Sequence, residues 1–286
     1  MCCPDIFFTT GPSIKKIQRI NENESVRFLG VWLDPHLNFN DHYKRIRKKL
    51  NFSLYAMEKI KNILQFDAMK LLYCSFFHSH LEFSSTFLFS TSKNNINKIE
   101  AMQKKAIRLL IGLPRISHTS EAFWALNILP FKVLCQYNVI KFLHHFKTGQ
   151  LPSTFENDFF LSKHIKKINL RNKEDFYIPR AKSSKIGMLP PHNFPKIWQE
   201  NKHIFPKQYT VDLLSNIREN LIDDYYKKNQ CLNSKNCYVC KRIQDSKDEF
   251  VRIKLKRLKR VKEIIKHKGC QKTARINNML GKTLFI

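Results

Sequence analysis

Apolar residues recur at intervals of three or four positions between residues 41 and 64, and this spacing constrains the fold more than any other feature. They are Ile46, Leu50, Leu54, Met57, Ile60 and Leu64. Residues spaced in this way lie on one face of an α-helix. The chain of 286 residues contains only 7 glycines, too few for many tight hairpins. The sequence therefore predicts a mainly α-helical protein.

Cap and breaker residues predict where the further helices begin and end. An oxygen-bearing side chain accepts hydrogen bonds at a helix start, whereas glycine ends a helix and proline opens one. The expected boundaries are Asp67 for a second helix, 95–111 closed by Gly112 for a third, Ser120 to Leu129 for a short one, and Pro130 to about Gly149 for the next. The stretch up to residue 150 is therefore expected to form a helical bundle.

Two short strands are expected before the first helix. Residues 6–8 form one, and residues 26–33 would be its partner across a polar loop, because both are rich in apolar residues suited to a sheet. Gly30 interrupts the second strand, where a bulge or a close backbone approach is expected. Asp34 and Pro35 end it, since the residue before a proline favours extended geometry.

The balance of charge is strongly positive. Lys and Arg total 51 against 23 acidic residues, which gives a net charge of +28 and an isoelectric point near 9.9. Such an excess contributes nothing to a fold and is typical of proteins that bind nucleic acid. A lysine-rich surface produced by biased genomic composition is the alternative. A membrane surface is disfavoured, because the basic tail lacks the aromatic belt of interfacial helices.

Four short motifs follow one another in a recognisable order. Residues 27–35 read RFLGVWLDP, residues 103–108 read QKKAIR, and residues 128–130 read ILP. The fourth is a spaced run formed by Pro179, Arg180, Gly187, Pro195 and Trp198. This order resembles the segment after the catalytic palm in reverse transcriptases of non-long-terminal-repeat retrotransposons, the jockey and CR1-like group. The resemblance covers roughly residues 1–200.

The resemblance implies a mainly α-helical, thumb-like bundle with a small amino-terminal β-hairpin and a basic helical carboxy-terminal tail. It divides the chain into terminal palm strands over 1–36 and a thumb-like domain over 37–150. An irregular, proline-rich wrap is expected over 151–206, and a separate basic unit over 207–286. The implied function is that of a fragment of an RNA-directed DNA polymerase that grips RNA and RNA–DNA hybrid, with the missing palm and fingers portion as a further partner.

Ten basic residues are candidates for contact with nucleic acid, because phosphate contacts need only Lys and Arg at the right surface. The candidates are Lys44, Arg45, Lys48, Lys105 and Arg108 in the bundle, Arg180 and Lys182 in the proline-rich stretch, and Lys256, Arg257 and Arg260 in a basic amphipathic helix expected over 250–268. A solvated surface without a partner is the alternative for each group.

Polymerase chemistry in this family requires carboxylates that hold two Mg²⁺ ions about 4 Å apart. The adjacent Asp223 and Asp224 lie in a helical pattern, which favours a solvated helix face over a metal-binding turn. The resemblance therefore implies that the catalytic site lies upstream of Met1, that Mg²⁺ belongs to that missing half, and that this chain alone is inactive. Two alternatives stay open: an exapted, non-catalytic nucleic-acid-binding protein, and a degenerate open reading frame without function.

A cysteine knuckle in the tail suggests a structural zinc site. Cys237 and Cys240 are spaced so that two thiolates can meet one ion. Cys231, with Cys270 or His267, could complete a tetrahedral set. Isolated reduced cysteines are the alternative, because the second half of the site lacks a close pair.

The sequence predicts an intracellular protein of the nucleus or the cytoplasm, not a secreted one. The first residues lack the basic and long apolar regions of a secretory signal. No run approaches the roughly 18 apolar residues of a membrane span. Eight cysteines without a signal are typical of reduced thiols.

Overall fold

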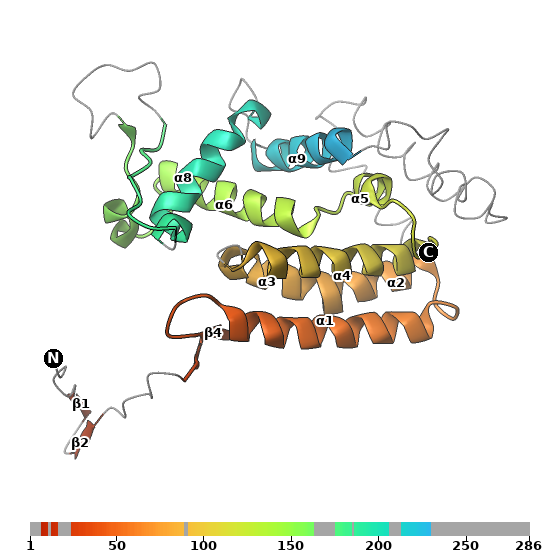
Figure 1. Cartoon of the computed structure of the whole chain (residues 1–286), viewed down its shortest axis with the longest axis horizontal. Helices are drawn as coiled ribbons and strands as arrows, with labels where there is room; N and C mark the ends of the chain where they lie inside the picture. The colour runs from red at the N-terminus through yellow and green to blue at the C-terminus, as the bar shows by residue number, and fades with distance from the viewer. Residues whose placement is uncertain are drawn as a thin grey trace.

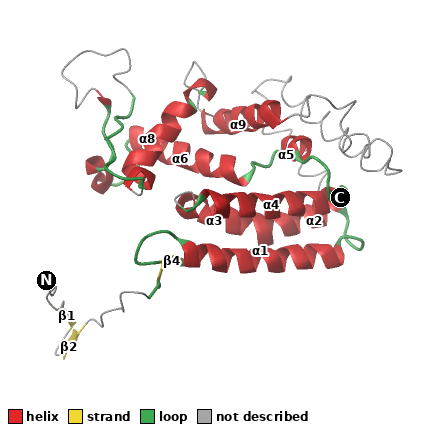
Figure 2. Cartoon of the chain, viewed as in Figure 1, coloured by secondary structure: helices red, strands yellow, loops and turns green. Residues whose placement is uncertain are grey.

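The chain forms a stack of helices preceded by two short hairpins, as the computed structural model shows (Figure 1). The described residues are 7–10, 13–16, 24–88, 91–162, 175–184, 186–205 and 213–229. Helix makes up most of this part of the chain, and strand is confined to its beginning (Figure 2). The prediction of a mainly α-helical fold with a small amino-terminal antiparallel sheet is confirmed.

The helices succeed one another through the stack in chain order. The first half contains α1 (Asn40–Ile60), α2 (Phe66–Leu72), the π-helix η1 (Tyr73–His78), α3 (Ser79–Leu88) and α4 (Lys93–Ile111). The second half contains α5 (Ser120–Leu126), α6 (Phe131–Lys147), α8 (Pro190–Glu200) and α9 (Leu213–Asn229), with short 3₁₀ helices η2 (Ser153–Asn157), η3 (Ile186–Met188) and η4 (Lys202–Ile204). Helix α1 forms one edge, α2 to α4 lie against it, and α8 and α9 lie on the far side of α6 (Figure 1).

Helix α1 confirms the predicted apolar stripe. It packs against α4 and η1. The buried residues of the stripe are Ile46, Leu50, Leu54 and Met57. The helix ends at Ile60, four residues before the last apolar residue of the predicted stripe, because the chain tightens into a turn in which the N–H groups of Ile63 and Leu64 both donate to the carbonyl of Ile60.

The predicted ends of the other helices are partly correct. Helix α4 begins after Ser92, whose hydroxyl accepts from the N–H of Asn95 at 3.4 Å, and it ends at Gly112 with a φ of 81°. Pro130 precedes α6 as expected. The prediction for Asp67 is wrong, because this residue lies in the first turn of α2 and makes no cap hydrogen bond.

The short helix α5 also differs from its prediction at both ends. Thr119 occupies the N-cap position, and Ser120 is the first helical residue, so Ser120 is not the cap. The helix ends at Leu126 and not at Leu129, because Asn127 takes a left-handed φ of 55°. Asparagine tolerates this conformation better than other non-glycine residues.

Both predicted strands exist, but their pairing is different. Strand β1 (Phe7–Thr10) pairs antiparallel with β2 (Ser13–Lys16), and β3 (Val26–Phe28) pairs antiparallel with β4 (Val31–Leu33). The predicted strand over 26–33 is thus a hairpin in itself. Leu29 and Gly30 have φ values of 46° and 85°. Two successive positive φ angles define a type I′ turn, whose twist matches that of the strands it joins.

Gly30 lies beside α3 at ordinary van der Waals distance. A Cβ atom on this residue would lie 3.4 Å from Cζ of Phe83 on α3. The turn of the β3–β4 hairpin therefore lies against α3, and α1 follows it through a loop held by Asp34. The carboxylate of Asp34 accepts from the N–H groups of Asn38 and Phe39 at 3.2 and 2.7 Å.

The stretch 151–206 contains a helix that was not expected. Prolines were predicted to break any long element there, yet Pro190 and Pro191 occupy the first two positions of α8. A proline at a helix start loses no hydrogen bond, because the N–H groups of the first turn have no partner within the helix. Pro195, inside α8, is buried with Trp198 in the core.

Helix α9 belongs to the same core as the bundle, although a separate unit was expected from residue 207. Its buried residues Leu213, Ile217, Leu221 and Ile222 are part of one continuous apolar cluster that begins in α1. It packs on α5 and α6. The expected basic helix over 250–268 lies outside the described residues.

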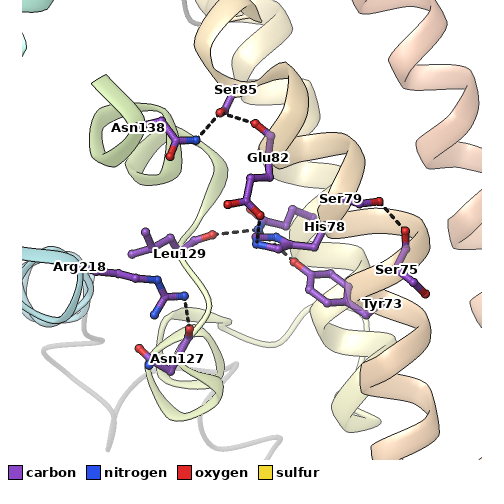
Figure 3. A network of polar contacts seen from close by, with 11 residues as sticks. Tyr73, Ser75, His78, Ser79, Glu82, Ser85, Asn127, Leu129, Asn138 and Arg218 are labelled. Atoms are coloured by element: carbon purple, nitrogen blue, oxygen red, sulfur yellow. Dashed lines mark hydrogen bonds and ion pairs between the residues drawn. The ribbon is translucent and has the colours of Figure 1, made fainter. Parts of the chain in front are cut away.

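Polar contacts link α3 to α6, and α9 to the residue that follows α5 (Figure 3). Asn138 donates to the hydroxyl of Ser85 at 2.6 Å, and Arg218 donates to the carbonyl of Asn127 at 2.7 Å. Burial lowers the pKa of the Arg218 guanidinium. The bond between α6 and α3 adds a directional link to the apolar contact between the two halves of the stack.

Candidate nucleic-acid interface

The outer face of α1 is the most basic surface built by one described helix. Because the core stripe occupies one side, the residues between its members point to solvent. The exposed basic residues of α1 are Lys44, Arg45, Arg47, Lys48, Lys49 and Lys59. Figure 1 shows α1 as the outermost helix of the stack, with α2 to α4 on one side. This face is therefore available to a partner.

The β3–β4 hairpin and the first half of α1 border an open pocket of about 630 Å³. It is lined by Arg27, Trp32, Asp41, His42, Lys44, Arg45, Ile46, Lys48 and Lys49. Five of these nine residues carry a positive charge, and one is a carboxylate. We call this site the hairpin pocket.

The guanidinium of Arg45 lies over an aromatic ring at the wall of the hairpin pocket. Its central carbon is 3.6 Å from the centre of the Trp32 ring, a cation–π contact. Such a contact uses the face of the guanidinium and leaves the N–H groups at its edge able to donate. Arg45 is thus fixed in place without losing its capacity to bind an anion.

His42 contributes a buried nitrogen to the same pocket. The residue is 2% exposed, and its Nδ1 accepts from the backbone N–H of Trp32 at 3.5 Å. In the neutral ring the proton is then on Nε2, which is buried and has no hydrogen-bond partner. Burial, and secondly the charge of Lys49, lower the pKa of His42, which favours the neutral ring.

The one carboxylate of the pocket is already occupied. Asp41 accepts from the hydroxyl of Ser25 at 2.5 Å and forms an ion pair with Lys44 at 2.9 Å. The bond from Ser25, and secondly that from Lys44, lower the pKa of Asp41. The pair neutralises Lys44 but leaves the charges of Arg27, Arg45, Lys48 and Lys49 in excess.

The structure brings three of the predicted residues together in the hairpin pocket, namely Lys44, Arg45 and Lys48. Lys105 on α4 is exposed and lies 3.5 Å from Glu58 of α1. Hydrogen bonding and charge from Lys61, and then Lys105, lower the pKa of Glu58.

The other predicted residues lie elsewhere. Arg108 donates through Nε to the carbonyl of Ser117 at 3.0 Å, so it supports the loop after α4. Arg180 and Lys182 are exposed near η3 and do not line the hairpin pocket. Lys256, Arg257 and Arg260 lie outside the described residues.

Several residues of this surface were not predicted. Arg27 and Trp32 belong to the hairpin, and Phe52 and Tyr55 belong to α1. Phe52 and Tyr55 are 68% and 62% exposed. Their positions off the apolar stripe were the available signal, because an aromatic residue there cannot reach the core.

No metal centre is formed by the described side chains, among which no three His, Cys, Asp or Glu residues are grouped to hold an ion. Asp223 accepts from Nε1 of Trp124 at 2.7 Å, and Asp224 pairs with Lys228 at 2.7 Å, both in helix α9. The zinc candidates Cys231, Cys237, Cys240 and Cys270 lie outside the described residues, so that site stays a prediction.

Within the same described ranges, no helix is both long and apolar enough to cross a membrane. Comparison of the chain with protein-family models, curated proteins and solved structures found no match. The family resemblance stated from the sequence therefore rests on the four motifs alone.

Proposed function

We propose that this chain binds nucleic acid through the hairpin pocket and the outer face of α1. The observation that carries the proposal is the excess of cations in the pocket, where five Lys and Arg side chains surround one paired carboxylate. Phosphate groups of RNA and of RNA–DNA hybrid would replace counterions at these side chains. Such binding is independent of base sequence and sensitive to salt.

We place this activity in the carboxy-terminal portion of a reverse transcriptase of the non-long-terminal-repeat retrotransposon type. In this role the chain grips template and hybrid, while the carboxylates and Mg²⁺ of polymerisation belong to a part of the enzyme outside this chain. The chain alone would not extend a primer. Its site of action would be intracellular, in the nucleus or the cytoplasm.

One observation also favours an exapted, non-catalytic nucleic-acid-binding protein. The core runs without a break from α1 to α9, so the described helices bury their apolar faces on one another. A fold of this kind can exist without a catalytic half. Binding without primer extension is expected in both cases, and the second requires the isolated chain to be stable.

A salt titration of binding to a short RNA–DNA hybrid tests the proposal. Log affinity of the unaltered chain should fall linearly with log salt concentration. The Lys48→Ala/Lys49→Ala double variant should reduce the salt slope by about 1.4–1.8, since each phosphate contact contributes about 0.7–0.9. Lys141→Ala, at an exposed position of α6, is the control and should leave the slope unchanged.

Two results would contradict the proposal. One is a folded chain that does not bind the hybrid at low salt. The excess of positive charge would then reflect only the biased composition of a degenerate reading frame. The other is an equal change of the salt slope in the pocket variant and in Lys141→Ala. Binding would then be spread over the whole surface and would not belong to the pocket.

A further inference from the structure

Two aromatic side chains lie in the middle of the basic outer face of α1. Phe52 and Tyr55 are exposed, although the core of α1 is complete on its opposite side. The ammonium of Lys59 lies 5.4 Å from the centre of the Tyr55 ring. Two exposed rings between lysines offer stacking surfaces to a ligand that also carries negative charge.

Their spacing makes one line along the helix. Residues three and four apart are neighbours on a helix surface, so Lys48, Phe52, Tyr55 and Lys59 succeed one another with two rings between two cations. The rise of the helix separates Lys48 from Phe52, and Tyr55 from Lys59, by about 6 Å along the axis. The line continues from the hairpin pocket, of which Lys48 is a lining residue.

We propose that this face binds an unpaired strand of RNA or DNA, with the lysines on its phosphates and with Phe52 and Tyr55 stacked on its bases. The inference rests on the proposed function and specifies the form of nucleic acid. A single strand presents phosphates and flat apolar bases together, whereas a duplex keeps its bases stacked inside and offers this face only phosphates.

The charge of the face supports a polyanion over a protein as its occupant. The two carboxylates of α1, Asp41 and Glu58, are both held in ion pairs, with Lys44 and with Lys61 and Lys105. Between them the exposed residues of the helix are basic, polar or aromatic. A protein partner would have to present acidic side chains at the spacing of the lysines. A nucleic acid carries one negatively charged phosphate on every nucleotide.

An RNA–DNA hybrid in three forms tests the inference with the full chain. One form is blunt, the second has an unpaired RNA extension of about eight nucleotides, and the third has an abasic extension of the same length. The abasic form keeps the phosphates and removes the bases. Fluorescence anisotropy at one fixed salt concentration should show about tenfold tighter binding of the RNA extension than of the abasic one.

The Phe52→Ala/Tyr55→Ala double variant should bind these two extended forms equally, because the bases then have no ring on which to stack. The Phe52→Trp/Tyr55→Trp variant retains stacking surfaces and should keep the preference. Phe160→Ala, which truncates a half-exposed ring outside α1, is the matched control and should also keep it.

Each failure has its own meaning. If the unaltered chain binds both extended forms equally, or if the double alanine variant keeps the preference, the inference is wrong and the two rings belong to a protein contact. If the unaltered chain binds none of the three forms at low salt, the proposed function itself fails.

Discussion

The side chain of Gln103 shows how one residue can hold two segments of this chain together. Its amide nitrogen donates to the hydroxyl of Tyr73 at 3.2 Å and to the carbonyl of Leu129 at 3.0 Å, and its oxygen accepts from the N–H of Phe131 at 2.7 Å. Tyr73 and Leu129 face one another in Figure 3. Gln103 thus joins α4 to the turn before α6. The QKKAIR motif lies in α4, and the ILP motif lies in that turn.

Replacing this amide should be costly. We expect Gln103→Leu to lower the free energy of unfolding by about 2–4 kcal/mol, because the buried N–H of Phe131 and carbonyl of Leu129 lose their partner. Urea denaturation followed by circular dichroism measures the change. Gln65→Leu, at an exposed position whose side chain makes no cap bond, is the control and should stay within about 0.5 kcal/mol of the unaltered chain. An equal effect of both changes would contradict the assignment.

Single residues also show what the sequence can and cannot predict. Lys44, Arg45 and Lys48 were predictable as surface residues, because they lie off the apolar stripe of α1. Their convergence with Arg27 was not, because it depends on where the hairpin lies. The burial of His42 could not be predicted from the sequence either. It depends on the hairpin, where the backbone N–H of Trp32 donates to the His42 ring.

At the scale of elements, the β3–β4 hairpin decides whether the pocket exists. Its turn requires a positive φ at Gly30, and its tip lies against Phe83. We expect Gly30→Ala to lower the free energy of unfolding by about 1 kcal/mol, since an L side chain is strained at this φ. Affinity for the RNA–DNA hybrid should fall as well, because the hairpin carries Arg27 and Trp32.

Gly149→Ala is the matched control for this change. Gly149 also has a positive φ, of 67°, but a Cβ there would meet nothing within 4 Å, and the residue follows α6 far along the chain. A similar loss of stability with unchanged affinity is expected. Anisotropy titrations of both variants measure the difference, and a parallel loss of affinity in both would contradict a role of the hairpin.

The elements were predictable where local chemistry decides them. The apolar period of α1 and the glycine after α4 both gave correct results. The pairing of the strands was predicted wrongly. It depends on a turn in which Leu29 adopts a left-handed conformation that its side chain disfavours. The sequence predicts chain breaks at the prolines of α8, whereas two of them are its first helical residues.

At the scale of the whole molecule, α9 closes the stack. Nε1 of Trp124 on α5 donates to Asp223 of α9 at 2.7 Å, and the ring of Trp124 stacks on Tyr226 at 5.3 Å between centroids. Ile222 of α9 is fully buried. Packing across this contact couples the last described helix to all the others, which sequence periodicity within a single helix cannot indicate.

A substitution in α9 should therefore weaken the entire fold. We expect Ile222→Ala to lower the free energy of unfolding by about 2–5 kcal/mol in one cooperative transition. Tryptophan fluorescence and circular dichroism should report the same shifted midpoint, because Trp32, Trp124 and Trp198 lie in β4, α5 and α8. A main transition unchanged by Ile222→Ala would instead make α9 a separate unit, as the sequence alone had suggested. Ser215→Ala, at an exposed position of the same helix, is the control.

The two faces of helix α1 are subject to different requirements. Its inward stripe, with Ile46, Leu50 and Met57, is maintained by any requirement to fold. Its outward line, with Lys48 and Phe52, lies outside that core, and under the proposed function only a ligand maintains it. Descendants of this sequence that still bind nucleic acid would preserve both stripes. Descendants that merely persist as folded chains would keep the first and lose the second, so the substitutions on this one helix would tell a working protein from a relic.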